Sequence, residues 1–334
     1  MSKLVRVAFL SVLAAVLWSS CVDNRCIYRR YEGAVWNTTF SIVYRSDKQL
    51  DDSIREVMRM VESSLSPFSE SSLVSGINRG ESDRTDSLFR RIFLASQEVN
   101  RLSGGAFDPT VSPLVNLWGF GYKDGDGEPS GAEIDSALES VGILRCRLDG
   151  ERVVKASEKT EFNFSAITKG YGTDLVGEML ARNGCEDYMV EIGGEMALRG
   201  RNPHGEPWHV MVDAPFESDS AAVHSRLAVI HVSDCGVATS GNYRNFRDTS
   251  KGRVGHTISP VTGRPVVTST LSVTVVAANA MMADALATAC MAMRADSAMA
   301  MIEGLEGVSA MFVSVDDDGE WRIATSSRFP EIYR

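Results

Sequence analysis

Two oxygen-bearing side chains stand four residues apart in the otherwise apolar stretch MADALAT at residues 282–288. In a helix, residues four apart lie on the same face, so Asp284 and Thr288 would point in one direction. A buried carboxylate is costly unless a cation, a salt bridge or a helix N-cap role compensates it. Carboxylate and hydroxyl oxygens suit Mg²⁺, which takes few protein ligands and completes its shell with water and phosphate. The pair therefore indicates a magnesium site, with an N-cap role for Asp284 as the alternative.

A second candidate is the glycine-rich segment SGGAFDPT at residues 103–110. Its two glycines allow a turn with positive φ, and Pro109 keeps Asp108 extended. We therefore expect a carboxylate and an aromatic ring on a rigid loop. A tight turn that caps a helix is the alternative.

Two further segments with glycines are candidates for binding an anion. Residues 165–174, SAITKGYGTD, lead into a helix that we expect from about Tyr171 to Asn183. Backbone N–H groups at a helix N-terminus attract phosphate, and Lys169 would be nearby, unless it is simply a solvated side chain. Residues 191–195, EIGGE, follow an expected strand; a backbone nest is conceivable there, but a plain turn explains the two glycines better.

His256 opens the segment HTISPVTGRP at residues 256–265. A histidine at the end of a short strand, before a Pro/Gly turn, can be held by the backbone and offer one ring nitrogen to a substrate. A structural role is the alternative for an isolated histidine. The cysteines and histidines are scattered without zinc spacing, which argues against a histidine-rich transition-metal site.

The elements that position these residues follow from hydrophobic periodicity. Alternation of apolar residues predicts strands at 40–44, 188–192, 208–212, 227–232, 271–275 and 310–315. Three- and four-residue spacing predicts helices at 54–65 and 88–99, and two more at about 171–183 and 278–293. Strands and helices that occur in groups, without a regular βαβ period, favour an α+β fold with mixed or antiparallel sheets and packed helices.

The first twenty residues are typical of a lipoprotein signal peptide. Lys3 and Arg6 precede an apolar run from Val7 to Trp18, and small residues stand directly before Cys21. This run would rise only about 18 Å as a helix, too short to cross a bilayer. We expect cleavage before Cys21, lipidation of that cysteine, and a membrane-anchored protein of the cell envelope that faces the periplasm. A plain secretory signal is the alternative.

The predicted organisation is therefore a signal peptide at 1–20, a lipidated cysteine with its tether at 21–32, and one catalytic domain at 33–334. The chain has 334 residues, with 34 Lys+Arg against 44 Asp+Glu and a net charge of −10. Such a chain can bury a full core, which argues against disorder. Its acidic balance argues against a broad basic face that binds nucleic acid.

Together, in order and spacing, these segments resemble the ApbE family of FAD:protein FMN transferases from about Tyr31 to the C-terminal strands. The resemblance implies a single ApbE-like domain related to the T-fold. It implies an exported enzyme that uses Mg²⁺ to split FAD, joins FMN through a phosphoester to a Thr or Ser of a partner protein, and releases AMP. The implied partners are acceptor subunits of membrane redox complexes such as the sodium-translocating NADH:quinone reductase (Nqr) and Rnf.

Carried over by position, the resemblance implies Mg²⁺ ligands at the side chains of Asp284 and Thr288 and at the main-chain carbonyl of Thr168. It implies that His256 is the general base for the acceptor hydroxyl. The implied FAD contacts are Trp36, Phe68, Ala106, Phe107, Asp108, Ser165, Tyr171 and His256.

The sequence departs from the family pattern in three places. Trp36-Asn37-Thr38 stands for the usual Met-Gly-Thr, Asn163 for an aspartate, and Ser259 for the aspartate of the histidine loop. Two other functions stay open at this point. One is an FAD pyrophosphatase that releases free FMN and AMP, and the other is a non-enzymatic FAD-binding lipoprotein.

Overall fold

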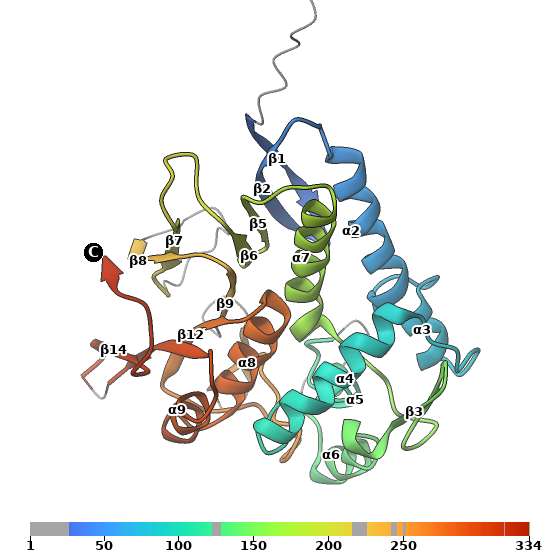
Figure 1. The fold of residues 1–334 in the computed structure, drawn as a ribbon. Coiled ribbons are helices and arrows are strands. Elements are labelled where there is room, and N and C mark those ends of the chain that lie inside the picture. The colour runs from blue at the N-terminus through green and yellow to red at the C-terminus, as the bar shows by residue number, and fades with distance from the viewer. Residues whose placement is uncertain are drawn as a thin grey trace, which may run out of the picture.

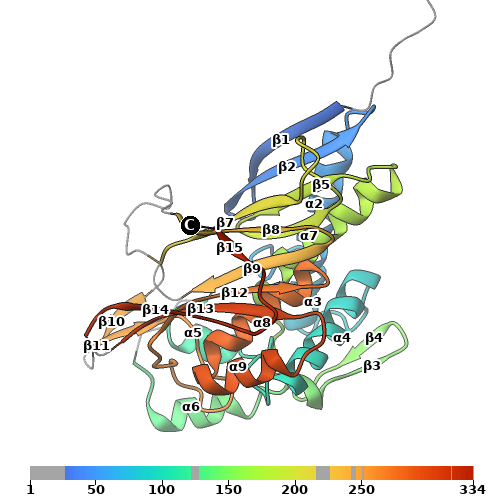
Figure 2. The same cartoon turned by 60° about the vertical axis from the view of Figure 1, so that its left-hand side comes forward.

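An antiparallel sheet of eight strands forms the centre of the computed structural model, which describes residues 27–121, 128–215, 226–241, 246–249, 252–316 and 318–333. The strand order is β1-β2-β5-β6-β9-β12-β13-β14, and every neighbouring pair is antiparallel (Figures 1 and 2). The strands are β1 (Ile27–Val35), β2 (Thr38–Ser46), β5 (Tyr188–Ile192), β6 (Glu195–Arg199), β9 (Cys235–Gly241), β12 (Thr270–Ala277), β13 (Ser309–Val315) and β14 (Trp321–Thr325).

Two helices, α7 (Ser165–Arg182) and α8 (Ala280–Ala292), cover one face of this sheet (Figure 1). Helices α2 (Asp51–Leu65) and α4 (Ser87–Leu102) pack against them from outside. The buried residues of α2 recur at three- and four-residue spacing, which gives the helix one apolar face. Helix α8 is buried on most sides because its alanines let the sheet and α7 approach closely.

A smaller sheet covers the other face. Its order is β15-β8-β7, with β7 (Trp208–Asp213), β8 (Arg226–Val232) and β15 (Ile332–Tyr333). Trp208, Val210 and Ile230 from this sheet pack with Leu198 and Val237 of the large sheet. The middle of the large sheet is thus buried on both sides, which makes its central strands a rigid platform.

A separate small core holds the loops near one end of the sheet. Leu114 of α5 (Ser112–Leu117) and Ile134 of α6 (Gly131–Leu138) pack around Trp118 and Ile258. The remaining elements are α3 (Leu73–Asn78), a 3₁₀ turn η1 (Ile143–Arg145), β3 (Arg147–Asp149), β4 (Arg152–Val154), β10 (Phe246–Thr249), β11 (Gly252–Gly255) and α9 (Ala295–Glu303).

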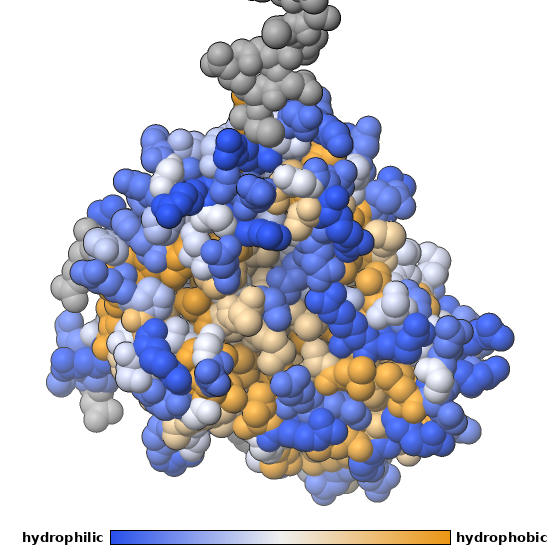
Figure 3. All heavy atoms as spheres, in the orientation of Figure 1, coloured by the Kyte–Doolittle hydropathy of each residue, from blue (hydrophilic) through white to orange (hydrophobic). Residues whose placement is uncertain are grey.

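The surface in Figure 3 is mostly hydrophilic, and hydrophobic residues gather towards the lower half, around α4, α8 and α9. Leu94 of α4 is an exposed apolar residue, with 56 % of its surface accessible. Within the described ranges, no helix has the length and apolarity needed to cross a bilayer.

The structure confirms the predicted α+β class, the six strands and the four helices. It corrects two boundaries. The third helix begins at Ser165 rather than near Tyr171. Residues 27–32, expected to be tether, form the first part of β1, which pairs with β2 along its whole length. The predicted signal peptide, Cys21 and the rest of the tether lie outside the described residues.

Candidate active site

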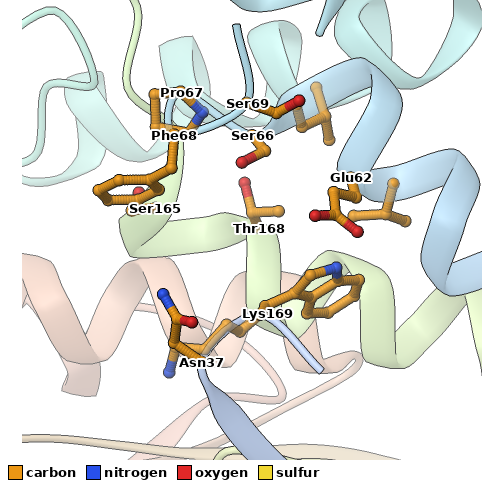
Figure 4. A pocket seen from close by; sticks show the side chains of 12 residues that line it. Asn37, Glu62, Ser66, Pro67, Phe68, Ser69, Ser165, Thr168 and Lys169 are labelled. Atoms are coloured by element: carbon orange, nitrogen blue, oxygen red, sulfur yellow. The ribbon is translucent and has the colours of Figure 1, made fainter. Parts of the chain in front are cut away.

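Two adjoining cavities, of about 520 and 590 Å³, meet at the N-terminal end of α7 and share Phe68, Ser165 and Lys169 in their walls. The first cavity lies between α2 and α7, and Figure 4 shows its lining. The second is formed by residues 106–109, the end of β9 at 239–241, residues 256–258 and the exposed side of α8. We call the two together the cleft. Its size suits an elongated ligand that binds across both cavities.

The predicted pair of oxygen ligands lies in the second cavity. Asp284 and Thr288 both line it, one turn apart on α8. The N-cap of α8 is Asn279, whose side chain accepts a hydrogen bond from Met282 N, so the N-cap alternative for Asp284 is wrong. Asp284 is 5 % exposed, and burial raises the pKa of its carboxyl above the ordinary aspartate value.

A close approach of α7 and α8 fixes the position of Asp284. Gly170 N donates to Asp284 Oδ2 at 3.0 Å. A β-carbon on Gly170 would lie 2.2 Å from the carbonyl oxygen of Ala280, so only glycine lets the helices approach this closely. The carboxylate is thereby held at the wall of the second cavity.

A partly buried ion pair stands beside this carboxylate. Lys169 Nζ on α7 contacts Glu195 Oε1 at the start of β6. Glu195 is 2 % exposed, and its Oε2 has no hydrogen-bond partner among the residues that the structure describes. Burial raises the pKa of the Glu195 carboxyl, and the Lys169 ammonium opposes that shift.

Sequence reasoning missed Glu195 as a site residue. The diglycine before it forms the turn that we expect, with φ of 65° at Gly193 and 101° at Gly194. That turn starts β6 with a glutamate whose side chain is buried in the cavity wall. The sequence signal that could have identified Glu195 is its position: it is a charged residue at the start of an apolar strand, β6.

The described lining of the second cavity fits a divalent cation. Asp284 and Glu195 carry two buried carboxylates, and the Lys169 ammonium pairs with Glu195 at the same wall. The buried Oε2 of Glu195 has no partner among the described residues, and a cation bound at this wall would compensate it. Oxygen donors of this kind suit Mg²⁺. Among the residues that the structure describes, no group of three His, Cys, Asp or Glu side chains gathers into a metal site.

Thr168, the third predicted ligand, lines the first cavity and lies on the same helix as Gly170. Its hydroxyl donates to the carbonyl oxygen of Phe164 at 2.8 Å. The side chain is therefore engaged within the helix, and a role as ligand through the main-chain carbonyl stays a prediction.

His256 follows directly after β11 and lines the second cavity, as the sequence pattern predicts for a histidine at a strand end. The turn after it is closed by hydrogen bonds from Gly263 N to Ser259 O at 2.8 Å and from Ser259 N to Arg264 O at 2.9 Å. Trp118 Nε1 donates to Gly263 O at 2.8 Å and ties the turn to the small core. The Ser259 hydroxyl accepts from Val261 N, so it supports the turn.

The loop at 103–110 is rigid, as expected, and Asp108 explains why. Its buried carboxylate accepts hydrogen bonds from Asn100 Nδ2 at 3.2 Å, Thr110 N at 2.8 Å and Ile143 N at 2.9 Å. Burial raises its pKa. These bonds engage the carboxylate within the protein, while Ala106, Phe107 and Asp108 still form part of the second cavity's wall.

Aromatic residues line the first cavity. Trp36 sits in the β1–β2 turn with φ of 49°, and its ring packs so closely on α7 that a β-carbon on Gly172 would lie 2.4 Å from it. Phe68 keeps 64 % of its surface exposed although it lines both cavities. In Figure 4 its ring lies near Ser165, the first residue of α7.

Tyr171 is the predicted site residue that lies apart from the others. Its side chain is buried in the main core, and the Arg91 guanidinium carbon stands 5.2 Å from its ring centre. Neither cavity has Tyr171 among its described lining residues. Its predicted contact with FAD stays a prediction, since the side chain is buried outside the described lining of both cavities.

Nearly the whole chain, including the segments that line this cleft, is similar to known proteins. The model of the ApbE family matches residues 36–312. A protein from Vibrio cholerae named FAD:protein FMN transferase is 33 % identical over 332 residues, covering 96 % of this chain and 98 % of its own length. A protein of the same name from Haemophilus influenzae is 29 % identical, with 99 % of both chains covered.

Solved structures show the same similarity. The flavin transferase ApbE from Vibrio cholerae superposes with a TM-score of 0.79 at 32 % identity, covering 91 % of this chain and 98 % of the other. The apo flavinyl transferase ApbE from Pseudomonas stutzeri gives a TM-score of 0.81 at 29 % identity, covering 91 % and 96 %.

Proposed function

The chain belongs to the ApbE family, and from that membership we propose that its cleft binds FAD with Mg²⁺ and transfers FMN to a protein. This chain is a FAD:protein FMN transferase. The observation that carries the proposal is the meeting of three distant segments in one cavity: residues 106–108, His256, and the Asp284/Thr288 pair.

The shape of the cleft supports an FAD that spans both cavities. FAD has two flat ring systems joined by a pyrophosphate. Trp36 and Phe68 give the first cavity aromatic surface on which a flat ring can stack. Polar groups at Ser165 and Lys169 stand where the two cavities join. A pyrophosphate at this junction would lie between the two ring sites and next to Asp284.

Asp284 and Thr288 would hold Mg²⁺ with their side chains, and Thr168 with its main-chain carbonyl. When bound, the ion neutralises pyrophosphate charge and favours departure of AMP. Gly170 N–H keeps the Asp284 carboxylate in place. The Lys169 ammonium adds positive charge at the same wall and is itself positioned by Glu195.

His256 would act on the second substrate. It accepts the proton from the Thr or Ser hydroxyl of the acceptor while that oxygen attacks the FMN phosphorus. A new P–O bond then joins FMN to the acceptor, the P–O bond of the pyrophosphate breaks, and AMP leaves. The rigid turn after His256 supports this role because a base works best when its ring is held near the reacting proton.

For the partner and the location we propose what the sequence suggests. The acceptors are subunits of membrane redox complexes of the Nqr or Rnf type, and Cys21 carries a lipid anchor in the cell envelope, facing the periplasm. Because β1 begins at Ile27, six residues after Cys21, an anchored domain would sit within about 20 Å of the membrane surface. Such a position suits a membrane-bound acceptor.

Purified residues 22–334 with FAD and Mg²⁺ test the function, with and without an acceptor domain from an Rnf-type subunit. We expect the acceptor to gain the mass of FMN, with one AMP released per FMN attached. Equal AMP without acceptor would favour the pyrophosphatase. Intact, tightly bound FAD with no AMP in either reaction would favour the non-enzymatic binding protein.

A further inference from the structure

Two strongly exposed valines lie on the hairpin that follows His256. Val267 is 96 % exposed and Val261 is 65 % exposed, although both belong to the hydrogen-bonded hairpin that follows His256, the candidate base. Single exposed apolar residues are common on protein surfaces. Two of them on one short hairpin beside a reactive side chain are a more specific observation.

Backbone hydrogen bonds place Val267 next to His256. Val266 N donates to Thr257 O at 2.9 Å, and Ile258 and Pro265 form an antiparallel bridge. The next residue on one side of this ladder is His256 and on the other is Val267. The most exposed valine of the hairpin therefore emerges within one residue position of the candidate base.

Val261 stands at the tip of the same hairpin, over the 103–110 loop. Its Cγ2 lies 3.7 Å from the position that a β-carbon on Gly105 would take. On the inner side of the turn, Gly263 packs so tightly on the small core that its β-carbon would lie 2.5 Å from Ile134 and 3.0 Å from Leu114. The turn is thus anchored by its inner side and presents Val261 outward.

Neither valine is among the described residues that line the two cavities. FAD inside the cleft is therefore not the group that would cover them. The reaction has a second substrate, and its hydroxyl has to reach His256 from outside the FAD site. Any chain that brings the hydroxyl there passes beside this hairpin.

We propose that the hairpin at residues 256–267 is the docking surface for the acceptor protein, with Val261 and Val267 contacting apolar side chains that flank the acceptor Thr or Ser. This inference rests on the proposed function, which requires a protein acceptor at His256. The occupant is an exposed loop of a folded acceptor domain. Burial of the two valines stabilises the complex, while the acceptor hydroxyl reaches His256 beside Val267.

Binding, measured separately from chemistry, tests this surface. The probe is the acceptor domain of an Rnf-type subunit whose acceptor threonine is changed to valine, so that no transfer occurs. We expect Val261→Ser with Val267→Ser to weaken its binding to the FAD-loaded protein about tenfold. FAD affinity should stay within twofold of the wild type. Val261→Ile with Val267→Ile, which keeps the apolar surface, should retain acceptor affinity.

Leu94→Ser is the matched control, because Leu94 is also an exposed apolar residue but lies on the outer side of α4. It should leave acceptor binding unchanged. Equal affinity of wild type and the double serine variant, or no binding by the wild type, would overturn the docking surface. A wild type that binds the acceptor but transfers no FMN to its threonine form would refute the proposed function and leave the docking result intact.

Discussion

At the residue scale, the proposed chemistry depends on Asp284, a buried carboxylate that is held by a hydrogen bond from Gly170 N. We expect Asp284→Ala to lower Mg²⁺-dependent turnover roughly a hundredfold or more, since a bound metal contributes several kcal/mol to charge stabilisation. FAD binding should be at least partly retained because the aromatic lining of the first cavity is untouched. Steady-state AMP release and FAD fluorescence titration measure the two effects.

The matched control for this variant is Asp52→Ala, since Asp52 is a fully exposed carboxylate on α2 that pairs with Arg55. It should turn over like the wild type. Unchanged turnover of Asp284→Ala would refute the metal assignment.

Asp174 provides a second prediction at this scale, through pH. Its carboxylate accepts hydrogen bonds from Ala280 N and Met281 N at the start of α8, and burial raises its pKa from 3.8 to about 6. A raised carboxyl pKa means that the folded state binds the proton more tightly than the unfolded state. The contribution of this group to stability therefore grows as the pH falls from above 6 towards 3.8.

We expect the free energy of unfolding of wild type, minus that of Asp174→Asn, to be about 2 kcal/mol larger at pH 4.5 than at pH 7.5. Comparing the two pH values cancels the constant effect of the amide on the α8 cap. Urea denaturation of both proteins at both pH values measures these free energies of unfolding. The same difference at both pH values would show that Asp174 titrates normally.

At the element scale, the site depends on how closely α7 and α8 pack. We expect Gly170→Ala to cost about 1–3 kcal/mol of stability, because its methyl group would meet the backbone of α8. The same shift moves the Asp284 carboxylate, so turnover should fall even at temperatures where the variant is folded. Thermal denaturation and AMP release measure the two losses.

Gly131→Ala is the control, because Gly131 is also helical and a β-carbon there meets no atom within 4 Å. It should change stability by less than about 1 kcal/mol. If Gly170→Ala changed stability and turnover as little as this control, a methyl group would fit between α7 and α8. The close approach of the two helices would then not fix the position of Asp284.

The same scale shows what the sequence could predict. The apolar face of α2 and the alternation in β7 are visible in the residue order because each element buries one side. The strand β1 was missed because its residues are mostly exposed and polar, so nothing separates them from a tether. The start of α7 was missed because serine and glycine are weak helix formers, and only packing on α8 makes the segment helical.

Among the candidate residues, sequence spacing was enough for Asp284 and Thr288, which share one helix. The pairing of Lys169 with Glu195 was not predictable from spacing, because the two residues are 26 positions apart and meet only across α7 and β6. Tyr171 shows the converse. A position matched by family resemblance carries an aromatic ring that this fold buries in the core.

At the scale of the whole molecule, the large sheet and its helices bring segments from across the chain to one cleft, and the proposed anchor holds that cleft near a membrane. We expect Cys21→Ser to move the protein from the membrane fraction to the soluble fraction and to abolish palmitate labelling. The purified variant should keep wild-type AMP release, since the described domain begins at Ile27. A Cys21→Ser protein that stays in the membrane fraction would argue against the lipid anchor.

The most direct test of the whole account is a crystal structure with FAD and Mn²⁺, which replaces Mg²⁺ and is located by its anomalous signal. The account predicts one metal peak within about 2.2 Å of side-chain oxygens of Asp284 and Thr288, with FAD spanning both cavities and its pyrophosphate beside the metal. A metal bound elsewhere, or FAD outside the cleft, would contradict it.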